Sequence, residues 1–199
     1  MNKELFFALI SIVFFFIGIL PYFRDVLKWK TFPHPFSYFV WFILTGFNTL
    51  VLLLKWEYIS LIPAILNTLS CLTFTFYGIR TIKNIRINSF DYIFLLFALL
   101  LLPFYFYTRD VLLTVIFSII IDFLGYLPTI KKWWLQPWAE TLFTFLVIGL
   151  AQLFIVFSQE TFTLASSIFW IYACSVNIIF IVAIVSRRYY LKWWKSIFE

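Results

Sequence analysis

Seven apolar segments, each long enough to cross a lipid bilayer, follow one another along this chain of 199 residues. A transmembrane helix needs about 20 consecutive, mostly apolar residues. The segments are separated by short polar connections and lie at residues 5–23, 36–54, 58–79, 90–107, 111–130, 138–158 and 162–186. The sequence therefore predicts an all-α integral membrane protein with seven transmembrane helices, which leaves no room for a separate soluble domain.

The composition supports this prediction and excludes other classes of protein. Hydrophobic residues make up 64% of the chain and charged residues 12%, whereas soluble domains have about a quarter charged residues. Without a soluble domain, a disulfide scaffold, a Rossmann or P-loop enzyme and a dedicated nucleic-acid binder are excluded. The sequence contains no catalytic or zinc-binding motif, and Cys71 and Cys174 lie in apolar segments. We therefore expect no enzyme activity, no metal and no cofactor.

The basic residues predict the orientation of the chain in the membrane. Of the fifteen Lys and Arg residues, only Lys3, Lys55 and Arg109 fall on the side of the N-terminus, and the other twelve lie on the side of the C-terminus. The positive-inside rule then places the N-terminus outside and the C-terminus in the cytoplasm. The net charge of +6 is explained by anionic lipid head groups rather than by nucleic acid. Short outer loops and the absence of organelle signals suit a bacterial inner membrane.

A motif of the form F-[I/L]-G-x-L-P occurs in the first segment and again in the fifth. It spans residues 16–21 and 123–128, 107 positions apart, and Arg24 and Lys131 follow at the same distance. Similar offsets relate three further pairs, namely Pro33 with Pro137, Asn48 with Gln152, and Asn67 with Asn177. These pairs predict two parallel three-helix repeats, at residues 1–89 and 108–199, joined by a linker helix at 90–107.

Parallel repeats are typical of transporters, in which the substrate binds at mid-membrane between the repeats. Proline removes a backbone donor and weakens a helix, so Pro21 and Pro128, with Gly18 and Gly125, are candidate gate hinges. A proline that simply ends a helix at the membrane interface is the alternative for either position.

The layout, the orientation and the two motifs resemble the PQ-loop and SWEET superfamily. The resemblance rests on Gly-Ile-Leu-Pro at 18–21 and Gly-Tyr-Leu-Pro at 125–128. Tyr22 and Thr129 stand where that superfamily has a glutamine after the proline.

The stretches 30–37 and 122–132 also look like a group of uncharacterised bacterial seven-helix membrane proteins. The resemblance implies a small-solute carrier without a cofactor, which could assemble as a homo-oligomer. In the SWEET group an asparagine on the third helix of each repeat faces the sugar, and Asn67 and Asn177 match it by place and type.

Two acidic residues lie within the apolar segments, where a charge costs about 2.5 to 3.5 kcal/mol. Asp122 is surrounded in sequence by Ile119, Ile120, Ile121 and Phe123, and Glu140 lies near the start of the sixth segment. Both are candidates for proton coupling. A structural ion pair is the alternative for Asp122, and a favourable interaction with the helix dipole is the alternative for Glu140.

Four amide side chains and one tryptophan are candidates for substrate binding. Amides donate and accept hydrogen bonds, and an indole ring can stack on a sugar or a heterocycle. These candidates are Asn48, Asn67, Gln152, Asn177 and Trp41. Hydrogen bonds between helices are the alternative role for the amides, and packing is the alternative for the ring.

His34, the only histidine, lies between Pro33 and Pro35 in a basic connection and is interpreted as part of a turn or as a pH sensor. Two functions remain open from the sequence. The first is a transporter of small polar solutes, and the second is a non-transporting membrane protein that assembles with partner helices.

Overall fold

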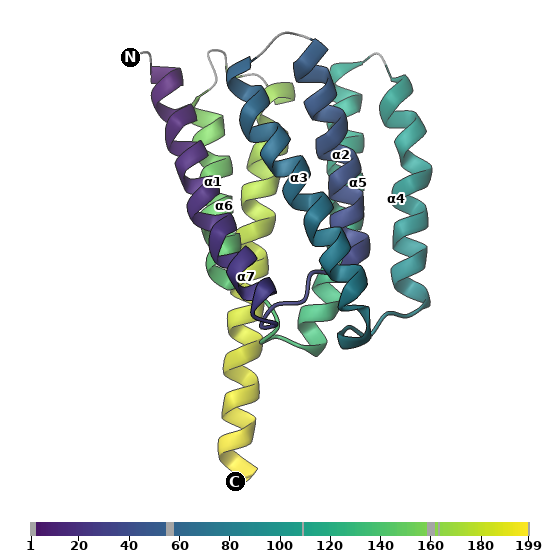
Figure 1. Cartoon of the computed structure of the whole chain (residues 1–199), viewed down its shortest axis with the longest axis vertical. Helices are drawn as coiled ribbons and strands as arrows, with labels where there is room; N and C mark the ends of the chain where they lie inside the picture. The colour runs from purple at the N-terminus through teal and green to yellow at the C-terminus, as the bar shows by residue number, and fades with distance from the viewer. Residues whose placement is uncertain (1–2, 55–57, 109, 159–161, 163, 199) are drawn as a thin grey trace. The chain divides into compact units, whose positions relative to one another are not determined.

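The computed structural model describes residues 3–54, 58–108, 110–158, 162 and 164–198. Within these residues the fold is entirely helical (Figure 1). Its elements are α1 (Lys3–Leu27), α2 (Pro35–Leu54), α3 (Tyr58–Arg80), the 3₁₀ helix η1 (Ile82–Asn84), α4 (Ser89–Tyr107), α5 (Val111–Leu135), α6 (Leu142–Phe157) and α7 (Leu164–Phe198).

Each α-helix coincides with one of the predicted segments, so the all-α prediction is confirmed. Four helical stretches among the described residues are long and apolar enough to cross a membrane, at Lys3–Leu27, Ser89–Tyr107, Leu112–Leu135 and Ser167–Trp193. Two shorter apolar stretches are Pro35–Phe47 and Leu142–Phe157. The chain is therefore a membrane-embedded helical protein.

The outward-facing side chains agree with a lipid environment. Leu20 of α1 is 63% exposed, Phe104 of α4 is 60% exposed and Ile179 of α7 is 66% exposed. Exposed apolar surface on this scale is unusual for a soluble monomer, but it is the normal outer surface of a helix in a bilayer.

The end of α5 and the start of α6 differ from those predicted. The helix α5 continues through Lys131 and Lys132 to Leu135, so both lysines are helical and do not belong to a connection. It ends before Gln136 because the residue preceding a proline, here Pro137, disfavours helical dihedral angles. A turn follows, in which the Ala139 amide donates to the Gln136 carbonyl, and α6 begins only at Leu142.

The chain divides into two compact units. The first unit comprises residues 1–31 and 133–199, with α1, α6 and α7, and the second comprises residues 32–132, with α2, α3, η1, α4 and most of α5. Each unit thus contains the first helix of one predicted repeat and the second and third helices of the other. The division into sequence repeats stays a prediction.

In the first unit, α6 packs against both α1 and α7. Gly18 allows the close approach of α1, because a Cβ atom at this position would lie 3.0 Å from Ile148 and 3.3 Å from Val147. Two hydrogen bonds join the same helices: Thr144 Oγ1 donates to the Gly18 carbonyl at 2.8 Å, and Ser11 Oγ donates to the Ala151 carbonyl at 2.9 Å.

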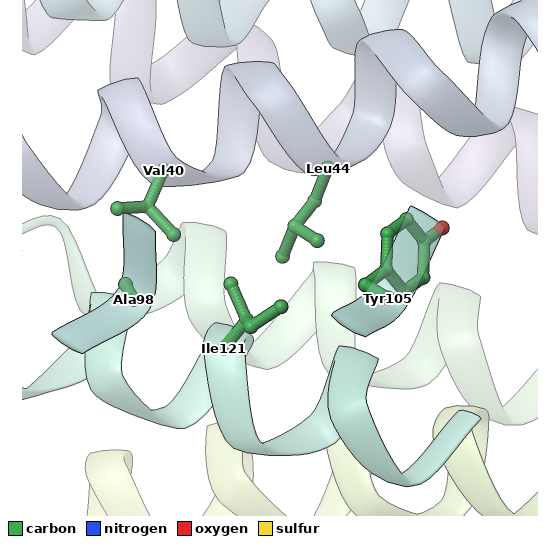
Figure 2. Packing of buried hydrophobic residues seen from close by; sticks show 5 residues of the cluster. All are labelled: Val40, Leu44, Ala98, Tyr105 and Ile121. Carbon is green, nitrogen blue, oxygen red and sulfur yellow. The ribbon is translucent and has the colours of Figure 1, made fainter. Parts of the chain in front are cut away.

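In the second unit, α2 packs against α3 and also contributes to an apolar core with α4 and α5. This core consists of Val40, Leu44, Ala98, Tyr105 and Ile121 (Figure 2). Beside it, a Cβ atom at Gly125 of α5 would lie 3.2 Å from Val40 and 3.3 Å from Trp41.

The two glycine contacts correspond to each other. Gly18 precedes Gly125 by 107 residues, and Val40 and Trp41 precede Val147 and Ile148 by the same number. In both units the first helix of one repeat therefore packs through its glycine on the second helix of the other repeat. The residues of the two contacts are thus 107 positions apart, the same offset as that of the two motifs.

Candidate functional site

The predicted site residues are distributed over both units. The first unit contains Gly18, Pro21, Glu140, Gln152 and Asn177, and the second contains Trp41, Asn48, Asn67, Asp122, Gly125 and Pro128. We describe the contacts of each set within its own unit.

Asn177 of α7 forms a buried hydrogen bond with Gln152 of α6. Its Nδ2 donates to Gln152 Oε1 at 3.0 Å and to the carbonyl of Ala173 at 2.8 Å, and the residue is only 2% exposed. Gly149 makes room for the pair, since a Cβ atom there would lie 3.2 Å from the Asn177 Cβ. These amides therefore join two helices, which is the alternative role that the sequence left open.

A similar arrangement joins α2 and α3 in the second unit. The hydroxyls of Thr49 and Thr68 are hydrogen-bonded at 3.0 Å, next to Gly46. The spacing from Gly46 to Thr49 equals that from Gly149 to Gln152. Asn67, which precedes Thr68, is half-buried. The side chain of Asn48 lies outside the described part of the chain.

Trp41 of α2 lies among aromatic and polar groups of the second unit. Its ring centroid is 5.0 Å from that of Tyr38 and 4.8 Å from that of Tyr126 of α5. Its indole Nε1 is buried and has no hydrogen-bond partner among the described residues. Asp122, one helical turn before Tyr126, is half-buried. An indole donor beside aromatic rings is suited to a polar ligand.

Glu140 does not lie within a helix. It is 4% exposed and belongs to the turn before α6, where its backbone carbonyl accepts a hydrogen bond from Arg188 Nη2 at 2.9 Å. Arg188 Nε also donates to the Pro137 carbonyl at 2.8 Å, and the guanidinium lies 4.9 Å from the centroid of the Trp138 ring. The surroundings of Glu140 thus hold the start of α6 against α7.

Pro21 and Pro128 both lie inside helices. The helix α1 continues past Pro21 to Leu27, and α5 continues past Pro128 to Leu135. Neither proline therefore ends its helix.

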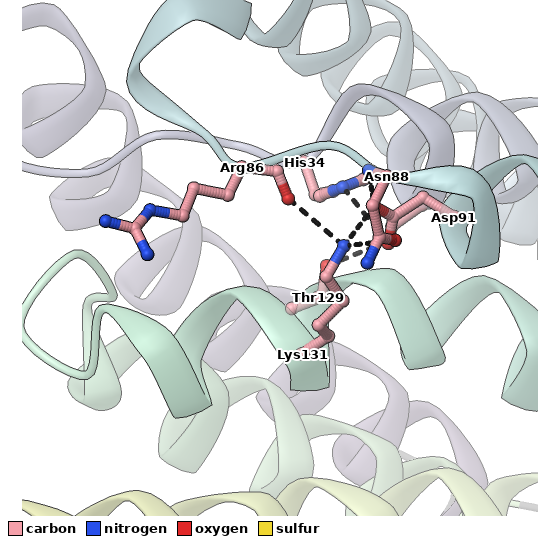
Figure 3. Close-up of polar contacts among 7 residues, drawn as sticks. His34, Arg86, Asn88, Asp91, Thr129 and Lys131 are labelled. Carbon is pink, nitrogen blue, oxygen red and sulfur yellow. Dashed lines mark hydrogen bonds and ion pairs between the residues drawn. The ribbon is translucent and has the colours of Figure 1, made fainter.

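An ionic cluster that was not predicted from the sequence lies at the start of α4 (Figure 3). We call it the α4–α5 cluster, and it consists of His34, Asn88, Asp91 and Lys131. Asp91 is fully buried in the first turn of α4 and forms a capping box with Asn88. Lys131 Nζ of α5 is paired with Asp91 Oδ2 and donates to Asn88 Oδ1 at 2.7 Å and to the Arg86 carbonyl at 3.1 Å.

His34 lies beside the Asp91 carboxylate, with 4.0 Å between His34 Nε2 and Asp91 Oδ1. The imidazole is 1% exposed. Burial, and then the positive charges of Lys132 and Lys131, lower the pKa of His34 from 6.5 to about 3. The histidine is therefore neutral at physiological pH, because burial and two lysines outweigh the attraction of the carboxylate.

The sequence did contain one local signal for this cluster. Asn88 followed three residues later by Asp91, just before an apolar run, matches the capping-box pattern at the start of a helix. The contributions of His34 and Lys131 come from positions that are 57 and 40 residues away from Asp91, so no local pattern predicts them.

No family model, curated protein or solved structure matches this chain. The resemblance to the PQ-loop and SWEET superfamily therefore stays a prediction from the sequence. Among the described residues, no group of three or more His, Cys, Asp or Glu side chains is placed to hold a metal ion.

Proposed function

We propose that this protein transports a small polar solute across a bacterial inner membrane by alternating access between its two three-helix repeats. The N-terminus lies outside and the C-terminus in the cytoplasm, as the positive-inside rule predicts. The observation that carries the proposal is the matched pair of helices α1 and α5. Each has a glycine contact to the second helix of the other repeat and a proline one turn later.

The proline of α5 lies where a hinge is useful. Pro128 has no N–H to bond the carbonyl of Leu124, four residues before it, so the helix is weakened at this turn. Beyond the proline, Lys131 ties the end of α5 to the start of α4 through Asp91. A helix with a weak turn followed by a breakable ion pair can alternate between two positions.

Trp41 and Asn67 are the residues that we assign to the substrate. The buried indole Nε1 of Trp41 offers a donor, and the half-buried amide of Asn67 offers both a donor and an acceptor. Asn177 and Gln152 are bonded to each other and have a packing role in this proposal. A neutral polar solute, such as a sugar, an amino acid or a vitamin, fits these groups.

Uptake into proteoliposomes tests the proposal. A panel of radiolabelled sugars, amino acids and vitamins is offered to vesicles with and without the protein. We expect at least one solute to accumulate, and we expect Trp41→Phe and Asn67→Ala each to lower its uptake roughly tenfold, as the loss of a substrate hydrogen bond does. The matched control is Trp134→Phe, at an exposed ring of α5, which should leave uptake unchanged.

A second function, a non-transporting protein that assembles with partner helices, is favoured by one observation. The amides of Asn177 and Gln152 are used inside the first unit and are not offered to a solute. This function predicts that no solute of the panel accumulates. It also predicts that a defined partner remains bound during extraction in mild detergent.

A further inference from the structure

We propose that His34 and Asp91 form a proton-binding site that is vacant while Lys131 is paired with Asp91 and is filled when the end of α5 leaves α4. This inference rests on the proposed transport function, because it names the proton as the ion that drives the movement of α5. It assigns the proton coupling to His34 and Asp91 in place of the two sequence candidates, Asp122 and Glu140.

The side chains of His34 and Asp91 have unused hydrogen-bonding capacity. Asp91 Oδ2 accepts hydrogen bonds from Lys131 Nζ and from the backbone N–H of Asn88, the second at 2.8 Å. Asp91 Oδ1 and His34 Nδ1 are buried and have no hydrogen-bond partner among the described residues. Buried polar atoms without partners are rare in proteins, so these two atoms need a physical explanation.

The two groups are close to each other but not hydrogen-bonded. Asp91 Oδ1 and His34 Nε2 are 4.0 Å apart, about 1 Å more than a hydrogen bond requires. The two side chains are 0% and 1% exposed, so both lie in an environment of low polarity. A proton on the imidazole would convert this near contact into a charge-assisted hydrogen bond.

The imidazole of His34 is surrounded by charges from two helices, α5 and α4. The cations are Lys131 and Lys132, and both belong to α5. Lys132 is anchored to the Phe32 carbonyl, and α4 contributes the carboxylate of Asp91. The helix α3 contacts the flanking prolines through the backbone of Gly78, which carries no charge. The side chain of Arg86 is exposed, and only its carbonyl joins the cluster.

Movement of α5 removes both cations from His34 at once. While they are present, they and burial keep the pKa of His34 at about 3. After they leave, the nearest charge is the carboxylate of Asp91, which favours the imidazolium, so the pKa of His34 rises from this lowered value. One proton then passes from water to the imidazole, and it is lost again when the lysines return.

The pH dependence follows from this linkage. The paired conformation has the lower His34 pKa and binds fewer protons than the released conformation, so the preference for the paired conformation is complete above the pKa that His34 has in the released conformation. It falls tenfold per pH unit as the pH is lowered below that value, until about pH 3, where both conformations are protonated. Acid on the cytoplasmic side therefore favours release of α5.

Because His34 is the only histidine in the chain, its titration can be followed directly by NMR. The whole protein is produced with ¹³C-labelled histidine, purified with a tag that contains no histidine, and titrated in nanodiscs. In the native protein we expect the ring to be neutral at pH 5.5. In Lys131→Met, which removes the ion pair and one of the two cations beside the imidazole, we expect the pKa of His34 to be higher than in the native protein. The matched control is Lys30→Met. Lys30 is exposed and lies in the same connection between α1 and α2 as His34, so its replacement should leave the pKa of His34 at the native value.

Two results would overturn the inference. One is a native His34 that is already protonated at pH 6.5, and the other is a pKa in both Lys131→Met and Lys132→Met that equals the native value. Circular dichroism confirms that each variant keeps its helix content, and the native titration decides the first point without any variant. The NMR readout needs no solute, so its outcome is separate from that of the uptake experiment. If uptake is found, His34→Gln should remove its dependence on pH between 5.5 and 7.5.

Discussion

Gly78 lies in the last turns of α3, where the segment from Pro33 to Pro35 crosses the helix. A Cβ atom at this position would lie 2.7 Å from the carbonyl oxygen of Pro33 and 2.9 Å from the nitrogen of Pro35. Both are backbone atoms and cannot rotate away. Because Gly78 has no side chain, the segment from Pro33 to Pro35 can lie against α3, and this position places His34 beside Asp91.

Replacement of Gly78 by alanine should lower the free energy of unfolding by about 1 to 3 kcal/mol, which is the usual cost of overpacking. Thermal unfolding in detergent measures the change. The matched control is Gly46→Ala, because a Cβ atom there would lie 3.6 Å from Thr68, an ordinary contact. The control should be neutral or slightly stabilising, since alanine favours helix. Equal unfolding temperatures for the two variants would contradict the close contact at Gly78.

The Asn177–Gln152 hydrogen bond predicts a measurable coupling between the two residues. In a double-mutant cycle of Asn177→Ala and Gln152→Ala, we expect about 0.6 kcal/mol of interaction free energy, as found for hydrogen bonds between membrane helices. Ser175 provides the control, because it is exposed and bonds only within its own helix, to the Ile171 carbonyl. Gln152→Ala and Ser175→Ala should therefore be additive. Additivity in both cycles would mean that the amide pair does not stabilise the helices.

At the level of the elements, the apolar runs predicted where each helix lies but not where it ends. The run of α5 ends near Ile130, yet the helix continues through two lysines, because Lys131 and Lys132 find carbonyl and carboxylate partners in the second unit. Conversely, Trp138 and Ala139 are apolar but belong to a turn, which Pro137 and Arg188 stabilise. Charge and hydropathy along the sequence indicate where a segment leaves the membrane. The end of a helix depends on the hydrogen-bond partners that its last residues find.

Replacement of the proline in α5 should have a different effect on transport from replacement of the proline in α4. Pro128 belongs to the repeated motif, whereas Pro103 lies exposed inside α4, outside both repeats. If α5 bends at Pro128 during transport, Pro128→Ala should lower the uptake rate roughly tenfold, because hinge changes slow conformational steps. Pro103→Ala should leave the rate unchanged. Equal uptake by both variants, measured at equal protein density in proteoliposomes, would exclude the hinge.

At the level of the whole molecule, the basic residues predict that the connections between α3 and α4 and the end of α7 face the cytoplasm. Cysteines introduced at Lys83 and Lys192, both exposed, should be labelled by a membrane-impermeant maleimide only after the cells are opened. A cysteine at Asp110, exposed before α5, should be labelled in intact spheroplasts. The native Cys71 and Cys174 are buried and should give little background. The opposite labelling pattern would invert the topology.

The sequence and the structure divide the chain into units in different ways. Self-similarity predicted units in chain order, whereas contacts group α1 with α6 and α7, and α5 with α2, α3 and α4. Both descriptions use Gly18 and Gly125, but a contact depends on which helices meet and not on their order in the chain. The number of residues between two similar motifs does not indicate which helix each glycine contacts.

The sequence by itself determined the helical class, the number and place of the apolar segments, and the pair of glycine–proline motifs, because these depend on hydropathy and local chemistry. Tertiary structure alone decided which polar groups are partners. Asp91 meets Lys131 and His34, and Asn177 meets Gln152, across separations of 25 to 57 residues. Such pairings have no local signal, since the free energy of burying a polar group depends on the partner that packing brings to it.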